Sequence, residues 1–186
     1  VAAGGCAELY GLKPDIVTYG KALGGGVPMA AIGGSHEIMS GLEWGKVLHF
    51  GTHNAGRLAL HICKTMLTTM LSDNQAGFVK IKDLGIKLTE EIQSISKKNN
   101  KNKMICQGVN SMFQIFFTDQ EKICNYRDFC RSVDRIKFRN FALKLFDKGI
   151  YMNPSATLHS LSSIIHTEKD IEVTARAIAE TLDEMP

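Results

Sequence analysis

Hydrophobic and polar positions change their spacing several times within the first 72 residues. Residues 15–19 and 29–34 are short β-branched or apolar runs bounded by proline and glycine, and they predict two buried strands. A short helix is expected over 35–42, with Ser35 as its N-cap. Over 57–71 apolar residues return every three or four positions, which predicts a helix that is largely buried.

After Ser72 the pattern becomes an alternation of longer helices and strands. Apolar residues at steps of three and four predict a long amphipathic helix over 81–95 and a second helix over 138–146. Thr167, followed three positions later by Asp170, predicts the cap of a final helix with an apolar inner side. Four strands are predicted between these helices, at 104–106, 111–118, 149–152 and 161–166.

This order of elements indicates an α/β protein with two domains. Residues 1–72 have the character of the end of a larger sheet domain, and residues 73–186 that of a complete small α+β domain. The chain begins at Val1, and its first recognisable segment, GGCAELYG, has the character of the middle of a domain. We therefore expect a fragment of a longer protein.

Composition favours a soluble intracellular protein. Hydrophobic residues make up 44% and charged residues 22% of the 186 positions. No apolar stretch approaches the roughly 20 residues that cross a bilayer, so we expect a cytoplasmic protein without a membrane partner. The net charge is only +3, and the one dense basic run, residues 97–103, contains no aromatic residue on which a base could stack. Nucleic-acid binding is therefore not expected.

Metal chemistry has little support in the sequence. The five cysteines show no CxxC or zinc-ligand spacing, and in their apolar context they suit buried free thiols better than a disulfide framework. His49 and His53 lie four positions apart without a glutamate between them, so we expect structural roles for both and no metal site. Four aromatic residues are expected to pack in the interior rather than to stack on a ligand: Trp44, Phe113, Phe116 and Phe117.

The segment TYGKALGGGVP, residues 18–28, places Lys21 just after a predicted strand and shortly before three glycines. An isolated lysine is usually a solvated loop residue. Ligands of open α/β sheets, however, collect at the carboxyl ends of strands. An amine withdrawn from water at such a place becomes a nucleophile toward a carbonyl group. The glycines at 24–26 would let backbone and cofactor approach closely and would tolerate positive φ.

The segment HFGTHNAG, residues 49–56, is a second candidate site, directly ahead of the helix predicted from residue 57. Backbone amides and the Thr52 hydroxyl near a helix N-terminus suit a phosphate, although such a turn by itself is usually only a cap. A cofactor with both an aldehyde and a phosphate would use Lys21 and Thr52 together. Pyridoxal phosphate is the common cofactor of this kind.

Five segments also follow one another in the order and spacing of a known family, and together they span essentially the whole chain. They are PDIVTYGKALGGGVPMAAIGG, GTHNAGRLAL, GVNSMFQIFF, GIYMNPS and SSIIHTEKDIEVT. With them the sequence resembles the class III, fold type I aminotransferases, and within that family the glutamate-1-semialdehyde 2,1-aminomutases. The resemblance implies the end of a pyridoxal-phosphate-binding large domain followed by a small α+β domain. It also implies amino-group transfer between small amino and keto compounds.

The resemblance assigns roles to three residues. Lys21 matches the lysine that forms a Schiff base with pyridoxal phosphate and then carries the substrate proton. Thr52 matches the threonine that reaches the cofactor phosphate of the neighbouring subunit, and Gly51 would allow the close approach. These matches imply a homodimer with a shared active site. For His53 and Asn54 the resemblance assigns no role, and cap or packing roles are expected.

Three departures from the family pattern keep other interpretations open. The aspartate that binds the pyridinium nitrogen in the family would precede Val1, so this chain alone is not expected to catalyse. Residues 56–58 read Gly-Arg-Leu where the family usually has Asn-Pro-Leu, and Thr157 and Leu158 stand where the aminomutases have phenylalanine and glutamate. The leading hypothesis is an aminotransferase or aminomutase. The alternatives are a non-catalytic descendant that acts as an interaction or dimerisation domain, and a Schiff-base lyase or aldolase.

Overall fold

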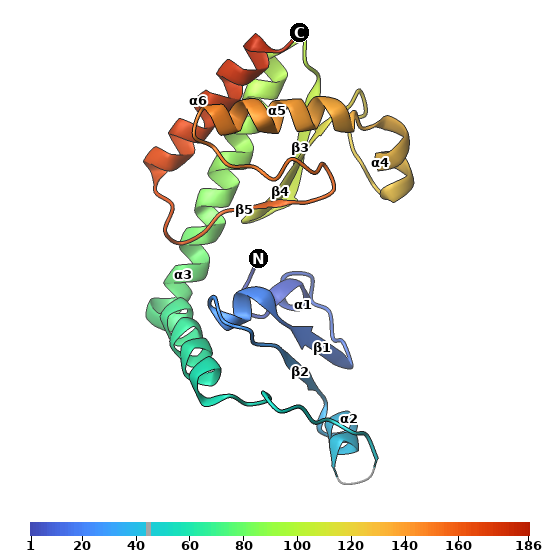
Figure 1. Ribbon diagram of the computed structural model, residues 1–186, viewed down its shortest axis with the longest axis vertical. Coiled ribbons are helices and arrows are strands. Elements are labelled where there is room, and N and C mark those ends of the chain that lie inside the picture. The colour runs from blue at the N-terminus through green and yellow to red at the C-terminus, as the bar shows by residue number, and fades with distance from the viewer. Residues whose placement is uncertain (44–45) are drawn as a thin grey trace. The chain divides into compact units, whose positions relative to one another are not determined.

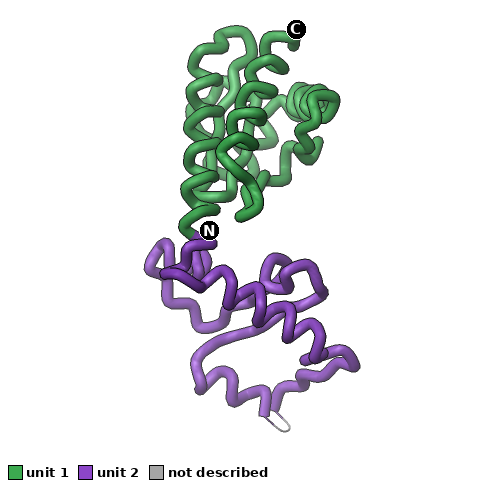
Figure 2. Tube along the Cα trace, turned by 90° about the vertical axis from the view of Figure 1, so that its left-hand side faces the viewer, with its two compact units in different colours: residues 1, 79–186 green, residues 2–78 purple. Residues whose placement is uncertain are grey.

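A computed structural model describes residues 1–43 and 46–186, and their contacts separate into two units. Figure 2 shows these units in two colours: residues 2–78 form one, and residues 79–186 together with Val1 form the other. Trp44, for which the sequence predicts a packing role, lies outside the described residues.

The unit of residues 2–78 contains a sheet of two antiparallel strands. They are β1 (Ile16–Tyr19) and β2 (Ala31–Gly34), and both coincide with predicted runs (Figure 1). The prediction that both strands are buried is wrong, since Ile16 is 54%, Tyr19 43% and Ile32 49% exposed. The physical reason is that β1 pairs only with β2, and a sheet of two strands leaves much of its surface uncovered.

Short helical turns surround this sheet. They are α1 (Gly5–Leu9), η1 (Lys21–Gly24), α2 (His36–Met39) and η2 (Ser40–Leu42). The helix predicted over 35–42 is confirmed as α2 followed by η2. Its predicted cap is also confirmed, because the Ser35 hydroxyl accepts a hydrogen bond from the Ile38 amide at 3.3 Å. Sequence reasoning missed α1.

Helix α3 (Arg57–Lys98) contains both of the helices predicted at 57–71 and 81–95. The two parts meet at residues 72–75, whose backbone is not helical. Asp73, Asn74 and Gln75 have φ of +50°, +56° and +66° in succession. Three consecutive left-handed residues break the right-handed helix at the place where the apolar pattern of the sequence is also interrupted.

The first part of α3 is less buried than its apolar pattern predicts. Cys63 and Met70 are buried, but Leu58 is 74% exposed and Leu60 and Leu71 are exposed as well. The prediction of a largely buried helix over 57–71 is therefore wrong. The apolar residues extend around more of the helix than the other elements of this unit cover.

The unit of residues 79–186 contains a three-stranded antiparallel sheet in the order β3–β4–β5. Its strands are β3 (Met104–Val109), β4 (Met112–Phe117) and β5 (Ser160–Leu161), and its helices besides α3 are α4 (Tyr126–Ser132), α5 (Arg135–Asp147) and α6 (Glu168–Glu184). The predicted helices over 138–146 and after Thr167 are confirmed. Thr167 and Asp170 form a reciprocal capping box at the start of α6.

Two strand predictions in this unit are wrong. Residues 149–152 form no strand, because Gly149 has φ of +81° and the Ile150 amide donates to the Leu145 carbonyl at 2.9 Å, which closes the end of α5 instead. Of the segment 161–166 only Leu161 is in a strand. The Ser163 amide donates to Nδ1 of His166 at 3.0 Å, so this segment is folded into a turn.

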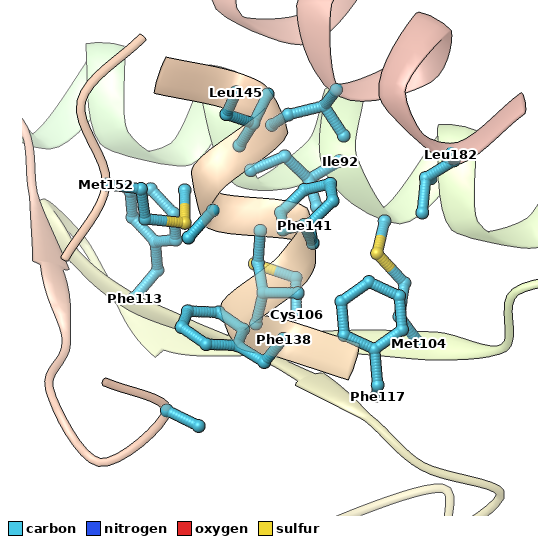
Figure 3. Close-up of a cluster of buried hydrophobic side chains, with 14 of the residues drawn as sticks. Ile92, Met104, Cys106, Phe113, Phe117, Phe138, Phe141, Leu145, Met152 and Leu182 are labelled. Atoms are coloured by element: carbon cyan, nitrogen blue, oxygen red, sulfur yellow. The ribbon is translucent and has the colours of Figure 1, made fainter. Parts of the chain in front are cut away.

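The hydrophobic core of this unit lies between the sheet and its helices, as Figure 3 shows. Ile92 of α3, Phe141 and Leu145 of α5 and Leu182 of α6 are all fully buried there. Phe113 is also buried, as the sequence predicts. Each such side chain contributes about 1.5–3 kcal/mol through the removal of apolar surface from water.

Candidate functional site

Lys21 lies at the exit of β1, after Gly20, and is the first residue of η1. Its φ is +53°, in the left-handed region that a residue with a Cβ rarely adopts. Its side chain is exposed, and its amine has no hydrogen-bond or ion-pair partner in the part of the chain that the structure describes. A strained backbone costs about 1 kcal/mol or more, and such positions cluster at functional sites. The positive φ of Lys21 therefore supports its choice as a candidate functional residue.

Two of the glycines that follow Lys21 have the backbone that the sequence predicts. Gly25 and Gly26 have φ of +58° and +103°. A Cβ built on Gly25 would lie 3.1 Å from the Cβ of Met66, so this turn packs directly against α3. Gly25 thus fixes the position of the turn that carries Lys21, whereas a Cβ on Gly26 would meet nothing within 4 Å.

Thr52 lies in an exposed turn, residues 52–55, just before α3 begins. A Cβ on Gly51 would lie 2.8 Å from Oδ1 of Asn54, and the Asn54 amide donates to the Gly51 carbonyl at 3.0 Å. Gly51 therefore makes room for the Asn54 side chain. No signal in the sequence indicates this contact.

A hollow of about 450 Å³ lies beside this turn. It is lined by residues of β2 and α2 together with His49, His53 and Asn54. Lys21 and Thr52 do not line it, and no hydrogen bond between described residues joins Lys21 to Thr52. No described contact therefore joins the two candidate residues, and both side chains are exposed.

The loop that departs from the family pattern is held by specific hydrogen bonds. Oδ1 of Asn153 accepts from the Ser155 amide at 2.9 Å, and the hydroxyls of Ser155 and Thr157 lie 2.8 Å apart. Nε2 of Gln114 donates to the Ala156 carbonyl at 3.1 Å. Sequence reasoning missed Gln114, although it lies between two inward-facing residues of β4 and so must face the other side of the sheet.

Three further observations bear on other possible roles of the chain. Among residues 1–43 and 46–186 no group of three or more His, Cys, Asp and Glu side chains could hold a metal ion. Within the same residues no helix combines the length and the apolar character that crossing a membrane requires. Burial raises the pKa of the Cys106 thiol to about 12, which makes it an unreactive core residue. Cys63 is buried as well, but the expectation of buried thiols is wrong for Cys6, Cys124 and Cys130, which are exposed.

The sequence from residue 2 to residue 185 matches the family described as Aminotransferase class-III. The chain belongs to this family. The resemblance seen in the five segments is thereby confirmed, and with it the mixed α/β fold class. Membership covers both units, since the match extends over nearly every residue.

Curated relatives of this class-III chain include glutamate-1-semialdehyde 2,1-aminomutases. The proteins of that name from Clostridium kluyveri and Thermus thermophilus are each 36% identical to it, over 179 and 183 residues. The alignments cover 96% and 98% of the chain but 42% of each relative. The chain thus spans less than half the length of the curated relatives that it matches.

Solved structures agree on the fold. An omega-transaminase from Sphaerobacter thermophilus aligns with a TM-score of 0.84 at 22% identity, over 97% of this chain and 41% of that one. A glutamate-1-semialdehyde aminomutase from Pseudomonas aeruginosa PAO1, a lysine-to-alanine variant in complex with PMP, aligns with a TM-score of 0.78 at 18% identity, over 100% and 42%. The class-III chain therefore has the fold of about two fifths of these enzymes.

Proposed function

We propose that this chain is the C-terminal part of a pyridoxal-phosphate enzyme that moves an amino group. The observation that carries the proposal is the family match over residues 2–185, within which Lys21 keeps a free, exposed amine on a strained backbone. Residues 1–72 would belong to the end of the cofactor-binding large domain, and residues 73–186 would form the small C-terminal domain.

The residues present fit the cofactor chemically. An aldehyde needs a primary amine without a competing ion pair, and Lys21 offers one. A phosphate needs a hydroxyl and backbone amides, and the exposed turn of Gly51 and Thr52 offers both. The proposal does not require Lys21 and Thr52 to meet within one chain, because Thr52 would serve the cofactor of the neighbouring subunit in a homodimer.

When bound, pyridoxal phosphate supplies an aldehyde for a covalent link and a ring that withdraws electrons from the substrate carbon. Lys21 would hold the cofactor through its Nζ, and the same amine would remove and return a substrate proton as a general base and acid. Thr52 would donate its hydroxyl to the phosphate. Gly51 would keep the turn compact by leaving space for Asn54.

Cofactor binding is the direct test of this proposal. The full-length protein incubated with pyridoxal phosphate should develop the absorption band of a protein-bound Schiff base, and Lys21→Ala should abolish the band. Lys13→Ala removes another exposed lysine of the same unit and should leave the band unchanged. If the parent protein forms no band, the enzyme hypothesis fails and a non-catalytic interaction domain becomes the better explanation.

Two reactions of this family remain to be distinguished. An aminomutase moves the amino group within one molecule and needs no separate keto acid, whereas an aminotransferase needs a donor and an acceptor. The curated relatives carry the aminomutase name, while Leu158 stands where the resemblance leads one to expect a glutamate. An assay with glutamate-1-semialdehyde alone and with donor and acceptor pairs decides between them, since product only with the pairs eliminates the aminomutase.

A further inference from the structure

The unit of residues 79–186 contains a pocket beside the first turns of α6. This pocket, the α6 pocket, has a volume of about 450 Å³, and small-molecule sites typically measure about 300–1,000 Å³. Five residues that are at most 9% exposed line it: Leu88, Phe113, Met152, Ser162 and Ile171. Figure 3 labels two of them, Phe113 and Met152, among the residues of the hydrophobic core. The α6 pocket therefore reaches below the surface of this unit.

The deep lining of the α6 pocket is mainly apolar. Of its five buried residues only Ser162 is polar, and the Ser162 hydroxyl already donates a hydrogen bond to the Ile81 carbonyl at 3.2 Å. Tyr151 also lines the pocket but is largely exposed, so an aromatic ring borders its opening. Such a lining suits the hydrocarbon part of a ligand, because apolar surface gains free energy when it leaves water.

One carboxylate lines the same pocket. Oδ2 of Asp170 accepts hydrogen bonds from the Thr167 amide and the Thr167 hydroxyl, both at 2.7 Å, whereas Oδ1 has no hydrogen-bond partner in residues 1–43 and 46–186. The hydroxyl and the amide of Thr167 lower the pKa of Asp170, so the carboxylate is ionised at neutral pH. The α6 pocket thus combines an apolar interior with a negative charge that has a free oxygen.

No basic side chain of the described residues neutralises this charge. Lys80 donates a hydrogen bond to the Ile164 carbonyl at 2.6 Å, and Lys87 pairs with Glu168 at 3.1 Å. Lys169, the residue before Asp170, forms no ion pair with it within the described part of the chain. The charge of Asp170 is therefore available to a ligand.

His166 is the other titratable residue of the lining, and it adds no positive charge. Its Nδ1 accepts a hydrogen bond from the Ser163 amide at 3.0 Å, so this nitrogen carries no proton. Neither lysine nor arginine is found among the described residues that line the pocket. The charge of the lining at neutral pH is therefore negative, which favours a cation and disfavours an anion.

We propose that the α6 pocket binds a small primary amine with an apolar body. Its ammonium group would pair with Oδ1 of Asp170, and its hydrocarbon part would pack against Leu88, Phe113 and Ile171. This inference does not rest on Lys21 or on the proposed function, because every residue that it uses belongs to the unit of residues 79–186.

A series of alkyl compounds tests the proposal on the full-length protein. The Lys21→Ala form is used so that no Schiff base forms at that residue, and binding is measured by ligand-observed nuclear magnetic resonance. Each buried methylene is worth about fourfold in affinity, so hexylamine should bind about tenfold more tightly than butylamine. Hexanol lacks the charge and should bind up to about fivefold more weakly than hexylamine, and hexanoate should bind more weakly still. Salt should reduce the difference between hexylamine and hexanol.

Variants of the full-length protein locate the bound amine. Asp170→Asn should lower the affinity for hexylamine to that for hexanol and leave hexanol unchanged. Thr174→Phe places a large ring on a residue that lines the α6 pocket, and it should abolish binding of both compounds. Arg176→Phe adds the same ring on the same helix at an exposed position outside this pocket, and it should leave binding unchanged.

A second control separates the charge of Asp170 from its role in the capping box. Thr167→Ala removes the hydroxyl of the cap but keeps the carboxylate, so it should retain the preference for hexylamine over hexanol. Thermal unfolding followed by circular dichroism shows whether each variant is folded. If Thr174→Phe does not fold, the comparison of Asp170→Asn with Thr167→Ala still decides the question.

Three results would overturn the proposal. The first is the lack of saturable binding of hexylamine, which would make the α6 pocket a gap filled by water. The second is equal binding of hexylamine, hexanol and hexanoate. The third is binding of hexylamine that Asp170→Asn and Thr174→Phe leave unaltered, since the amine would then lie elsewhere. Failure of the proposed function is a separate result, because a protein that forms no Schiff base with pyridoxal phosphate can still bind hexylamine in this pocket.

Discussion

Gly85 lies on α3 where the helix approaches the turn between β3 and β4 most closely. A Cβ built at this position would lie 2.4 Å from the Asn110 carbonyl oxygen and 2.6 Å from the Cα of Ser111, whereas ordinary contacts are 3.4–4 Å. Both neighbours are backbone atoms and cannot rotate away. Either the helix or the hairpin would have to move by about 1 Å to admit a methyl group.

Two effects of Gly85→Ala therefore oppose each other. Alanine in a helix is about 1 kcal/mol more favourable than glycine, so propensity alone would stabilise the variant. Overpacking costs about 1–3 kcal/mol, and the cost should lie at the upper end of this range because the added methyl group would clash with two backbone atoms. We expect the free energy of unfolding to fall by about 2 kcal/mol, because the steric term exceeds the gain in propensity.

Urea unfolding followed by far-ultraviolet circular dichroism measures this change. Lys82→Gly, at an exposed position of the same helix, is the control for helix propensity. It should lower the free energy of unfolding by roughly 1 kcal/mol, since no clash is involved. A Gly85→Ala protein as stable as the parent, or more stable, would refute the close packing of α3 against the hairpin.

Three further outcomes follow from the structure. Thr167→Ala should cost about 1 kcal/mol as the loss of a helix cap. The Thr167 hydroxyl and amide lower the pKa of Asp170 below its ordinary value. The loss of stability in Thr167→Ala should therefore be complete above the unfolded aspartate pKa of about 3.9, and it should shrink as pH falls through the lowered pKa of Asp170 in the folded protein. A loss of stability that stays the same until Asp170 is fully protonated would contradict the capping box. Gln75→Gly should raise stability by about 0.5–1 kcal/mol because glycine accepts the left-handed φ without a clash, and a lower midpoint in thermal unfolding would speak against that conformation. In native protein iodoacetamide should label the exposed Cys124 and leave Cys106 unlabelled until urea unfolds the chain, as peptide mass spectrometry would show; early labelling of Cys106 would mean that its strand is not buried.

Local signals in the sequence predict local structure well in this protein. Ser35 and Thr167 cap the helices that they are expected to cap, because an N-cap depends on contacts within three residues. The left-handed backbone at Gly25 follows in the same way from the absence of a side chain. Asn125 shows that such signals can be overlooked: its side chain caps α4, which the pattern of apolar residues does not reveal.

Contacts between distant segments are harder to predict from the sequence. The apolar run 149–152 has the composition of a strand, but the Ile150 amide bonds to the end of α5 instead. The hydrophobic pattern of 15–19 indicates burial without indicating what would cover the strand. The second error arises because a pattern states that a side chain is apolar, whereas burial depends on neighbours far away in the sequence. The first error is local, since Gly149 turns the chain back so that Ile150 bonds to Leu145, five residues earlier.

In the candidate site, too, some features can be predicted from the sequence and others only from the structure. Residue type and position single out Lys21 and Thr52, because an amine after a strand and a hydroxyl before a helix have recognisable chemistry. The positive φ of Lys21 and the packing of Gly51 around Asn54 depend on geometry that no spacing encodes.

Covalent attachment at Lys21 is the claim on which the proposed function depends most directly. Borohydride reduction of the full-length protein in the presence of pyridoxal phosphate, followed by protease digestion and peptide mass spectrometry, reports which lysine carries the cofactor. We predict one modified peptide that contains Lys21, with a pyridoxyl phosphate group on that residue. A label spread over other exposed lysines, with Lys21 unmodified, would contradict the claim.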